Sequence, residues 1–203
     1  MKRQVIEFCF LILALIIVGG ILFPVLTRHH DNRKQSCHGH LLQISLAIAM
    51  YSQDYDEKLP PVIFPGKTVG WVNGLQPYVK SYWIFQCPSE KNPMQNISMP
   101  HKSGFTDYWM NSNLSGIEET NIPFSNEVII SGDGDGGSSE STASYSIDQL
   151  PEYWRTSLHS PAKRHLDGAN YAFVDGHVKW LKPEQVSQLS PSKKNPVYTF
   201  SIQ

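Results

Sequence analysis

The chain has 203 residues and a formal net charge of −1, with 17 Lys and Arg against 18 Asp and Glu. This length suits one membrane anchor together with one modest globular domain. The near-neutral charge, without a basic stripe along the chain, argues against a nucleic-acid-binding protein.

The N-terminal region contains a long apolar run. No charged residue occurs from Phe8 to Leu26. A helix of this length extends about 28 Å, close to the roughly 30 Å hydrocarbon core of a bilayer. We therefore predict that residues 1–27 form a transmembrane anchor, with membrane lipid as a partner. A cleaved signal peptide is the alternative, but no small-residue cleavage site follows the run.

Charged residues at the start of the chain suggest an orientation. Lys2 and Arg3 precede the apolar run, which favours a cytoplasmic N-terminus, although basic residues also follow the run. We predict a single-pass protein of the inner (cytoplasmic) membrane whose larger part is periplasmic or extracellular. Glu7 stands at the edge of the run, where an ionisable group marks a candidate functional site. Alternatively, its side chain simply reaches the headgroup region.

Helical periodicity resumes after a polar stretch. Apolar residues at spacings of three and four then mark one helical face. They are Leu41, Ile44, Ile48, Tyr51 and Tyr55. Because Pro60 and Pro61 cannot continue a helix, we predict that it ends near Glu57. Residues 28–57 would form the extracytoplasmic part of one long helix, and residues 58–203 a globular head.

The head is predicted to contain short elements. Aromatic and β-branched residues favour strands over 105–111 and 126–131, and the Gly-rich residues 132–144 favour a flexible loop. Residues 71–80 and 183–189 are predicted to form short helices, and residues 81–90 an extended stretch.

Asp175-Gly176, between two alternating runs, is a strong β-hairpin signal. A two-residue turn would pair Tyr171 with Trp180 on an aromatic face that the helix at residues 41–55 could cover. We therefore predict an α+β fold, in which the long N-terminal helix packs on a small antiparallel sheet.

The chain resembles bacterial prepilin-like proteins whose C-terminal region carries a His, nine residues and then Asp-Gly. Here His165 is followed at that spacing by Asp175 and Gly176. Glu7 and Pro24, seventeen positions apart, match the family's N-terminal helix. The resemblance also includes the stretch after the apolar run and the Cys-Pro segment, so it extends over most of the chain.

The resemblance implies a pilin-like head and a subunit that assembles through its N-terminal helix into a type IV pilus or a type II secretion pseudopilus. Its partners would be other pilin-like subunits. In the family, a Glu neutralises the N-terminal amine of a neighbouring subunit, a role that falls to Glu7 here. A prepilin peptidase is a further candidate partner, but Lys2 and Arg3 stand where the family has Gly and Phe. The alternative function is that of an uncleaved, signal-anchored extracytoplasmic binding protein with a pilin-like head.

Three cysteines occur along the chain. Cys9 lies in the apolar run and is predicted to be a small buried hydrophobe. Cys37 and Cys87 lie outside it and would form a disulfide if the head is exported, with two free thiols as the alternative.

Several polar residues offer metal-ligand chemistry, although a structural role is favoured for each. Near the hairpin these are His165, Asp167, Asp175 and His177. In the Gly-rich loop they are Asp133 and Asp135, which lack the distal Glu of an EF-hand loop. Before the head they are His29, His30, His38 and His40, around Cys37. No cofactor is therefore expected, and calcium, by analogy with some pseudopilins, is the weak candidate.

Catalytic motifs are absent from the sequence. It contains no Gly-x-Ser-x-Gly, no His-Glu-x-x-His and no phosphate-binding loop. We therefore do not expect an enzyme.

Overall fold

The computed structural model describes residues 2–90, 99–189 and 197–202; in the first helix, the side chains of residues 2, 3, 5, 6, 8, 9 and 24–32 lie outside the description. The chain divides into two compact units, Met1–Gln35 and Ser36–Gln203. The helices are α1 (Lys2–Asp54), α2 (Trp71–Gly74) and α3 (Glu152–Thr156). The strands are β1 (Tyr108–Asn111), β2 (Ile129–Asp133), β3 (Ser146–Ile147), β4 (Ala169–Phe173), β5 (Val178–Leu181), β6 (Val186–Ser187) and β7 (Tyr198–Thr199).

The first unit consists of the N-terminal part of α1. Among the residues that the structure describes, none of the helices combines the length and the apolar character needed to cross a membrane. Such a span requires about 20 consecutive, mostly apolar helical residues. The transmembrane anchor predicted over residues 1–27 is therefore wrong. The predicted single-pass location in the inner membrane, which depended on this anchor, is wrong with it.

The second unit contains the C-terminal part of α1, which is amphipathic as predicted. Leu41, Ile44 and Ile48 are buried in the core, whereas Leu42 and Leu46 on other faces are exposed. This spacing of three and four residues is the one expected for a single buried helical face. The interpretation of this segment as a helix packed on the head is confirmed from Leu41 to Tyr51, whereas Tyr55, also assigned to this face, lies beyond the helix and is 51% exposed.

The helix ends at Asp54, slightly before the predicted boundary at Glu57. Asp56 and Glu57 both adopt left-handed backbone conformations, with φ of 56° and 59°. A left-handed residue just beyond a helix reverses the chain direction and stops further helical hydrogen bonding. The prolines at 60 and 61 therefore follow a helix that has already ended.

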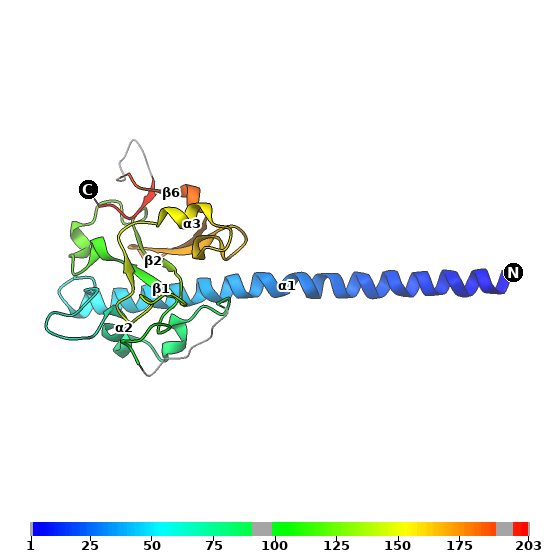
Figure 1. Ribbon diagram of the computed structural model, residues 1–203, viewed down its shortest axis with the longest axis horizontal. Coiled ribbons are helices and arrows are strands. Elements are labelled where there is room, and N and C mark those ends of the chain that lie inside the picture. The colour runs from blue at the N-terminus through cyan, green and yellow to red at the C-terminus, as the bar shows by residue number, and fades with distance from the viewer. Residues whose placement is uncertain (1, 91–98, 190–196, 203) are drawn as a thin grey trace. The chain divides into compact units, whose positions relative to one another are not determined.

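The core of the second unit is built on a five-stranded sheet of order β3-β1-β2-β4-β5 (Figure 1). The pairs β1·β2, β2·β4 and β4·β5 are antiparallel, and β1·β3 is parallel. The α+β class is therefore confirmed, but the sheet is mixed, not purely antiparallel as predicted. Strand β1 lies within the range predicted for it, residues 105–111, whereas β2 overlaps the predicted range 126–131 and continues past it to Asp133.

Both faces of the sheet are covered. The head portion of α1 packs against one face, where its buried residues share one core cluster with Tyr108, Met110 and Ala172. On the opposite face, Tyr171 and Phe173 pack with Trp109, Trp154 and Phe200 in a second cluster. The prediction that the aromatic face of the hairpin meets the helix is wrong. Because β4 is buried on both faces, alternation alone does not identify the face that the helix covers.

The hairpin β4–β5 forms as predicted, but in a different register. Trp180 pairs with Asn170 instead of Tyr171. The Phe173 N–H donates to the His177 carbonyl over 2.9 Å, and the Gly176 N–H donates to the Phe173 carbonyl over 2.9 Å. The connection is thus a three-residue loop that ends in a left-handed glycine, Gly176, with φ 89°. The one extra loop residue shifts the pairing by one position.

The predictions for the short elements of the head are only partly confirmed. Residues 71–80 contain α2 as predicted, but residues 81–90 contain a 3-10 turn, Tyr82–Phe85, where an extended stretch was expected. Residues 183–189 form a 3-10 turn, Pro183–Gln185, followed by β6, and not an α-helix. The predicted flexible loop at residues 132–144 begins inside β2, and further along the chain it is held by hydrogen bonds to its backbone. The N–H groups of Phe105 and Thr106 both donate to the carbonyl of buried Ser141.

Candidate functional site

A disulfide joins the head portion of α1 to a loop fifty residues later. It links Cys37 and Cys87, whose Cα atoms are 5.4 Å apart. Both residues are buried. The predicted pairing is confirmed, and the alternative of two free thiols does not apply to this structure. The bridge fixes the first helical turn of the head to the segment that follows the Tyr82–Phe85 turn.

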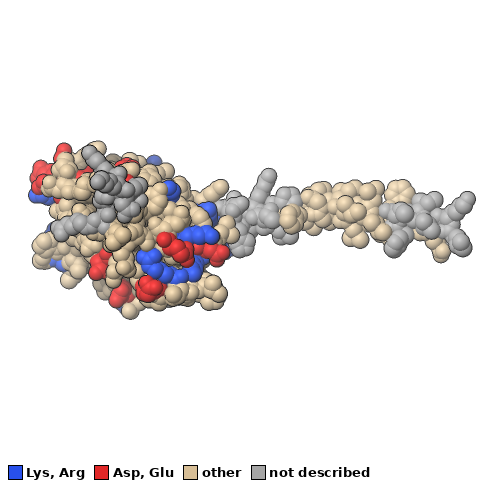
Figure 2. Space-filling model, turned by 90° about the horizontal axis from the view of Figure 1, so that it is seen from above, with Lys and Arg blue, Asp and Glu red and all other residues tan. Residues whose placement is uncertain are grey.

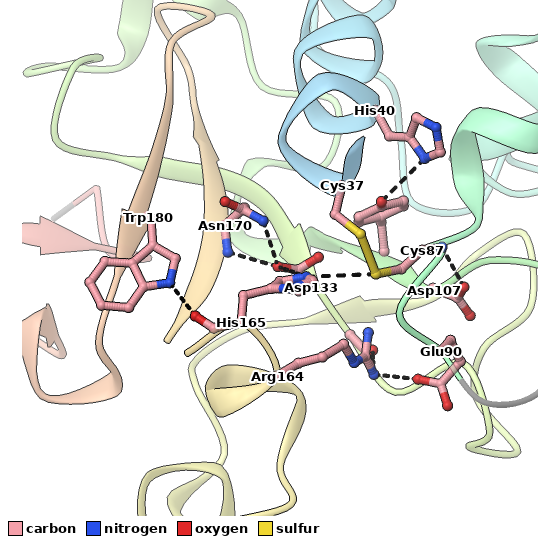
Figure 3. A network of polar contacts seen from close by, with 12 residues as sticks. Cys37, His40, Cys87, Glu90, Asp107, Asp133, Arg164, His165, Asn170 and Trp180 are labelled. Carbon is pink, nitrogen blue, oxygen red and sulfur yellow. Dashed lines mark hydrogen bonds and ion pairs between the residues drawn. A yellow bond between two sulfur atoms is a disulfide. The ribbon is translucent and has the colours of Figure 1, made fainter. Parts of the chain in front are cut away.

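A buried carboxylate and a buried imidazole lie beside this disulfide (Figure 3). Asp133, the last residue of β2, lies with its Oδ2 3.4 Å from the Nε2 of His165. The same Nε2 lies 3.7 Å from the Sγ of Cys87. Asp133 Oδ2 also accepts hydrogen bonds from the N–H of Asn170 over 2.7 Å and from its side-chain amide over 3.3 Å. Among the described residues, no hydrogen-bond donor reaches the other oxygen, Asp133 Oδ1.

The backbone around His165 explains how the ring is held. Leu166 and Asp167 adopt left-handed conformations with φ of 58° and 62°, which turns the chain back toward the sheet. The His165 N–H donates to the Gly168 carbonyl over 2.8 Å, and the indole N–H of Trp180 donates to the His165 carbonyl over 2.6 Å. Strand β5 thus anchors the histidine whose ring enters the network.

The two ends of the His-nine-Asp-Gly motif therefore have different structural roles. His165 contributes its ring to the buried network, whereas Asp175 and Gly176 form the loop of the hairpin. At this loop, Asp175 Oδ1 accepts a hydrogen bond from the His177 N–H over 3.2 Å and lies 2.5 Å from the His177 ring Nδ1. The favoured structural role of Asp175 in the turn is confirmed.

A second buried carboxylate supports the loop that carries Cys87. The Cys87 N–H donates to Asp107 Oδ2 over 2.6 Å. Burial raises the pKa of Asp107 to about 7, although this hydrogen bond and the nearby Arg164 guanidinium both favour the ionised form. Arg164 forms an ion pair of 2.5 Å with Glu90 and donates to the Gly134 carbonyl over 2.8 Å.

The structure regroups the predicted metal-ligand candidates. The sulfur atoms of Cys37 and Cys87, the imidazole of His165 and a carboxylate oxygen of Asp133 all lie within 4.8 Å of one another. Of the other candidates near the hairpin, Asp175 pairs locally with His177. Asp135 accepts the N–H of Gly137 over 3.0 Å in its own turn, and Asp167 serves the backbone reversal next to His165.

This four-residue cluster was missed by sequence reasoning, which placed three of its members in three different candidate groups and considered the fourth, Cys87, only as a disulfide partner. Its residues come from α1, from the loop after the Tyr82–Phe85 turn, from β2 and from the turn before β4. No short motif links positions so far apart. The available signal was the presence of Cys and His, the residue types that bind soft metals, in a chain with only three cysteines.

The histidines before the head do not gather around Cys37 where the structure describes them. His40 Nδ1 lies 2.8 Å from the Gln86 carbonyl, and burial lowers the pKa of His40. His38 is half-buried. The side chains of His29 and His30 lie outside the described residues, and so does that of Cys9.

The N-terminal part of α1 presents an apolar surface. Every residue from Phe10 to Phe23 is exposed within this structure. Figure 2 shows this stretch without the red or blue of charged side chains, whereas charges of both signs are interspersed over the visible face of the head. Of the two predicted assembly residues, Glu7 is exposed, and the side chain of Pro24 lies outside the described residues.

Comparisons of the chain with protein-family models, with curated proteins and with solved structures found no match. A functional interpretation therefore depends on the residues and on the geometry described above.

Proposed function

We propose that this chain is a pilin-like or pseudopilin subunit, which assembles with other pilin-like subunits through its N-terminal helix into a type IV pilus or a type II secretion pseudopilus. The observation that carries the proposal is the unbroken apolar surface of α1 between Phe10 and Phe23. The sequence resemblance described above, from Glu7 to the His-nine-Asp-Gly motif, supports the same function.

The pattern of this surface favours a helical bundle over a single docking contact. Phe10, Leu15 and Phe23 are 68%, 70% and 71% exposed, and every residue between them is apolar or glycine. Successive helical residues are rotated by about 100°, so this stretch is apolar on all sides and not on one stripe. Covering one large apolar side chain contributes about 1.5–3 kcal/mol. Identical helices packed around each other would cover all sides at once.

The head is suited to being carried on such a bundle. It has its own core, in which the C-terminal part of α1 packs on the sheet. The disulfide between Cys37 and Cys87 adds a covalent link between this part of α1 and the head. A cross-link at the first buried turn resists peeling of the helix from the sheet when the helix is pulled.

Glu7 would supply the charged contact in the bundle. A carboxylate in an apolar environment requires a well-placed cation, because an isolated buried charge is costly. The N-terminal amine of a neighbouring subunit is the partner that the resemblance implies. Removal of the carboxylate would then weaken assembly without changing the fold of the head.

Shearing of cells that express the full chain tests this function. The sheared filament fraction should contain the chain, and Glu7→Ala should lower its incorporation while the disulfide and the circular dichroism of the head stay unchanged. Glu184→Ala is the matched control, since Glu184 is an exposed carboxylate on the head. Absence of the unmodified chain from filaments, or equal incorporation of the Glu7→Ala variant, would contradict the proposal.

A further inference from the structure

The cluster of Cys37, Cys87, Asp133 and His165 has a geometry that filament assembly does not require. Its measured separations are 3.7 Å from Cys87 Sγ to His165 Nε2 and 3.4 Å from His165 Nε2 to Asp133 Oδ2. In a tetrahedral zinc site, with Zn–S near 2.3 Å and Zn–N or Zn–O near 2.0–2.1 Å, these ligand separations are about 3.6 Å and about 3.3 Å. The spacings of His165 Nε2 from Cys87 Sγ and from Asp133 Oδ2 are therefore those of zinc ligands, whereas the two bonded sulfur atoms would have to separate.

The cluster is buried and supported from outside. All four residues are buried. Asn170 donates two hydrogen bonds to Asp133 Oδ2, and Trp180 holds the backbone of His165. Such secondary contacts orient the ligands of metal sites and are important for affinity. The rigid support means that little reorganisation of the protein would be needed to bind an ion.

Asp133 gives an independent indication of a missing partner. Its Oδ1 is buried and has no hydrogen-bond partner among the residues that the structure describes. An unsatisfied buried acceptor costs about 1–3 kcal/mol, and more when it is charged. A cation bound to Asp133 would neutralise the charge of this carboxylate and so lower that cost.

The donor set selects the kind of ion. Two thiolates, one imidazole and one carboxylate suit zinc, whereas calcium and magnesium prefer oxygen ligands alone. The calcium candidate considered from Asp133 and Asp135 is thus replaced by a different metal and a different set of ligands. In the disulfide state the two sulfur atoms are bonded to each other, so the zinc ligands become available only after reduction.

We propose that this cluster is a redox-controlled zinc site: the disulfide-bonded form binds no zinc, and the reduced form binds one zinc ion through Cys37, Cys87, His165 and Asp133. Reduction by a dithiol breaks the S–S bond, transfers two electrons and two protons to the cysteines, and leaves the reductant as a disulfide. Zinc then displaces the two thiol protons to solvent and accepts the unprotonated Nε2 of His165. In both forms α1 remains cross-linked to the loop at Cys87, first by the disulfide and then by the metal.

Spectroscopic titration of the full chain with Co²⁺ tests the site. The chain, reduced with a phosphine under anaerobic conditions, should bind one equivalent of Co²⁺ with the intense visible bands of tetrahedral coordination and a thiolate charge-transfer band. Added Zn²⁺ should bleach these bands. The disulfide-bonded chain should show neither the visible bands nor the charge-transfer band. Such bands in the disulfide-bonded chain would overturn the proposal, because they would place the metal elsewhere.

Co²⁺ binding by single-residue variants shows which side chains are ligands of the metal. Cys87→Ser and His165→Gln should each weaken Co²⁺ binding by at least about ten-fold. His177→Gln is the matched control and should bind like the parent, because His177 is a histidine in the loop of the β4–β5 hairpin and lies outside the cluster. Unchanged affinity of the His165→Gln variant, or no binding by the folded reduced chain, would overturn the proposal. If reduction alone unfolds the head, added Zn²⁺ should restore its circular dichroism. A reduced chain that stays unfolded with Zn²⁺ would also overturn the proposal.

Discussion

Gly176 occupies a backbone conformation that few other residues tolerate. Its φ of 89° lies in the left-handed region, and no atom lies within 4 Å of the position that a Cβ would occupy. The cost of Gly176→Ala is therefore conformational and not steric. We expect the free energy of unfolding to decrease by about 1 kcal/mol.

Urea denaturation of the disulfide-bonded chain measures this change. Gly176→Asn should lose less stability than Gly176→Ala, since Asn visits the left-handed region more readily. If both variants were as stable as the parent, Gly176 would not be constrained in solution as it is here.

Asp107 makes the stability of the disulfide-bonded head depend on pH. Its pKa is raised from 3.8 to about 7, chiefly by burial. Because the folded-state pKa is the higher one, the stabilising effect of the protonated carboxyl is complete below about pH 4 and is lost as pH rises through about 7. The free energy of unfolding should thus fall over this range by on the order of 4 kcal/mol relative to Asp107→Asn.

The comparison with Asp107→Asn isolates this carboxyl from the other titrating groups. The amide keeps an oxygen that can accept the Cys87 N–H but does not titrate. Urea denaturation of both chains between about pH 4 and about pH 8 gives the difference. Parallel pH profiles would show that Asp107 has an ordinary pKa.

Individual residues differed in how much their sequence context revealed. The position of Cys37 and Cys87 outside the apolar run left a disulfide and two free thiols as alternatives, and His165 was singled out by its spacing from Asp-Gly. Asp133 was assigned to a flexible loop because glycines surround it, whereas it ends strand β2 in the core. Only the pairing of β2 with β4 brings Asp133 beside Asn170 and His165, and such tertiary pairing leaves no local sequence signal.

The secondary-structure elements were predicted best where one face is buried and the other exposed. Leu41, Ile44 and Ile48 on α1 fit a helical period, which located the packed face of the helix. The hairpin was found from Asp175-Gly176, but its register depended on whether the loop contains two or three residues. Both loops suit the same dipeptide, so the sequence does not distinguish them.

The segment between β2 and β3 is an ordered part of the head, and a pair of adjacent glycines tests this. A Cβ at Gly136 would overlap the buried carboxyl of Asp107, whereas a Cβ at Gly137 would lie 3.4 Å from Asp135 Oδ1. Asp107 cannot easily move away, because it holds the Cys87 N–H. Gly136→Ala should lower the free energy of unfolding by about 1–3 kcal/mol.

Gly137→Ala is the matched control in the same turn and should change stability by less than about 0.5 kcal/mol. Thermal or urea unfolding of the two variants measures the difference. Equal stability of both would mean that the segment is mobile, as its composition suggested, and that its contacts with Asp107 are not maintained.

At the scale of the whole molecule, the chain combines a unit with its own core and a helical unit in which every residue from Phe10 to Phe23 is exposed. The length of the chain suggested one membrane anchor plus one globular domain, whereas the structure divides into two compact units, the first of them helical, and shows no membrane-spanning helix among the described residues. The apolar run was interpreted as a membrane span because hydropathy alone does not distinguish lipid from protein as the covering surface. Under the proposed function, other copies of the helix provide the cover.

A charge placed in the apolar stretch tests whether this surface drives association. Leu15 is 70% exposed on α1, and Leu158 is 77% exposed on the head. Leu15→Lys should weaken self-association of the full chain by at least ten-fold, since about 1.5–3 kcal/mol of apolar burial is lost and a charge must be accommodated between helices. Leu158→Lys, an equal change on an equally exposed leucine, should leave association unchanged. Sedimentation velocity over a concentration series measures both, and an equal loss in the two variants would show that association occurs through exposed leucines in general and not through the N-terminal helix.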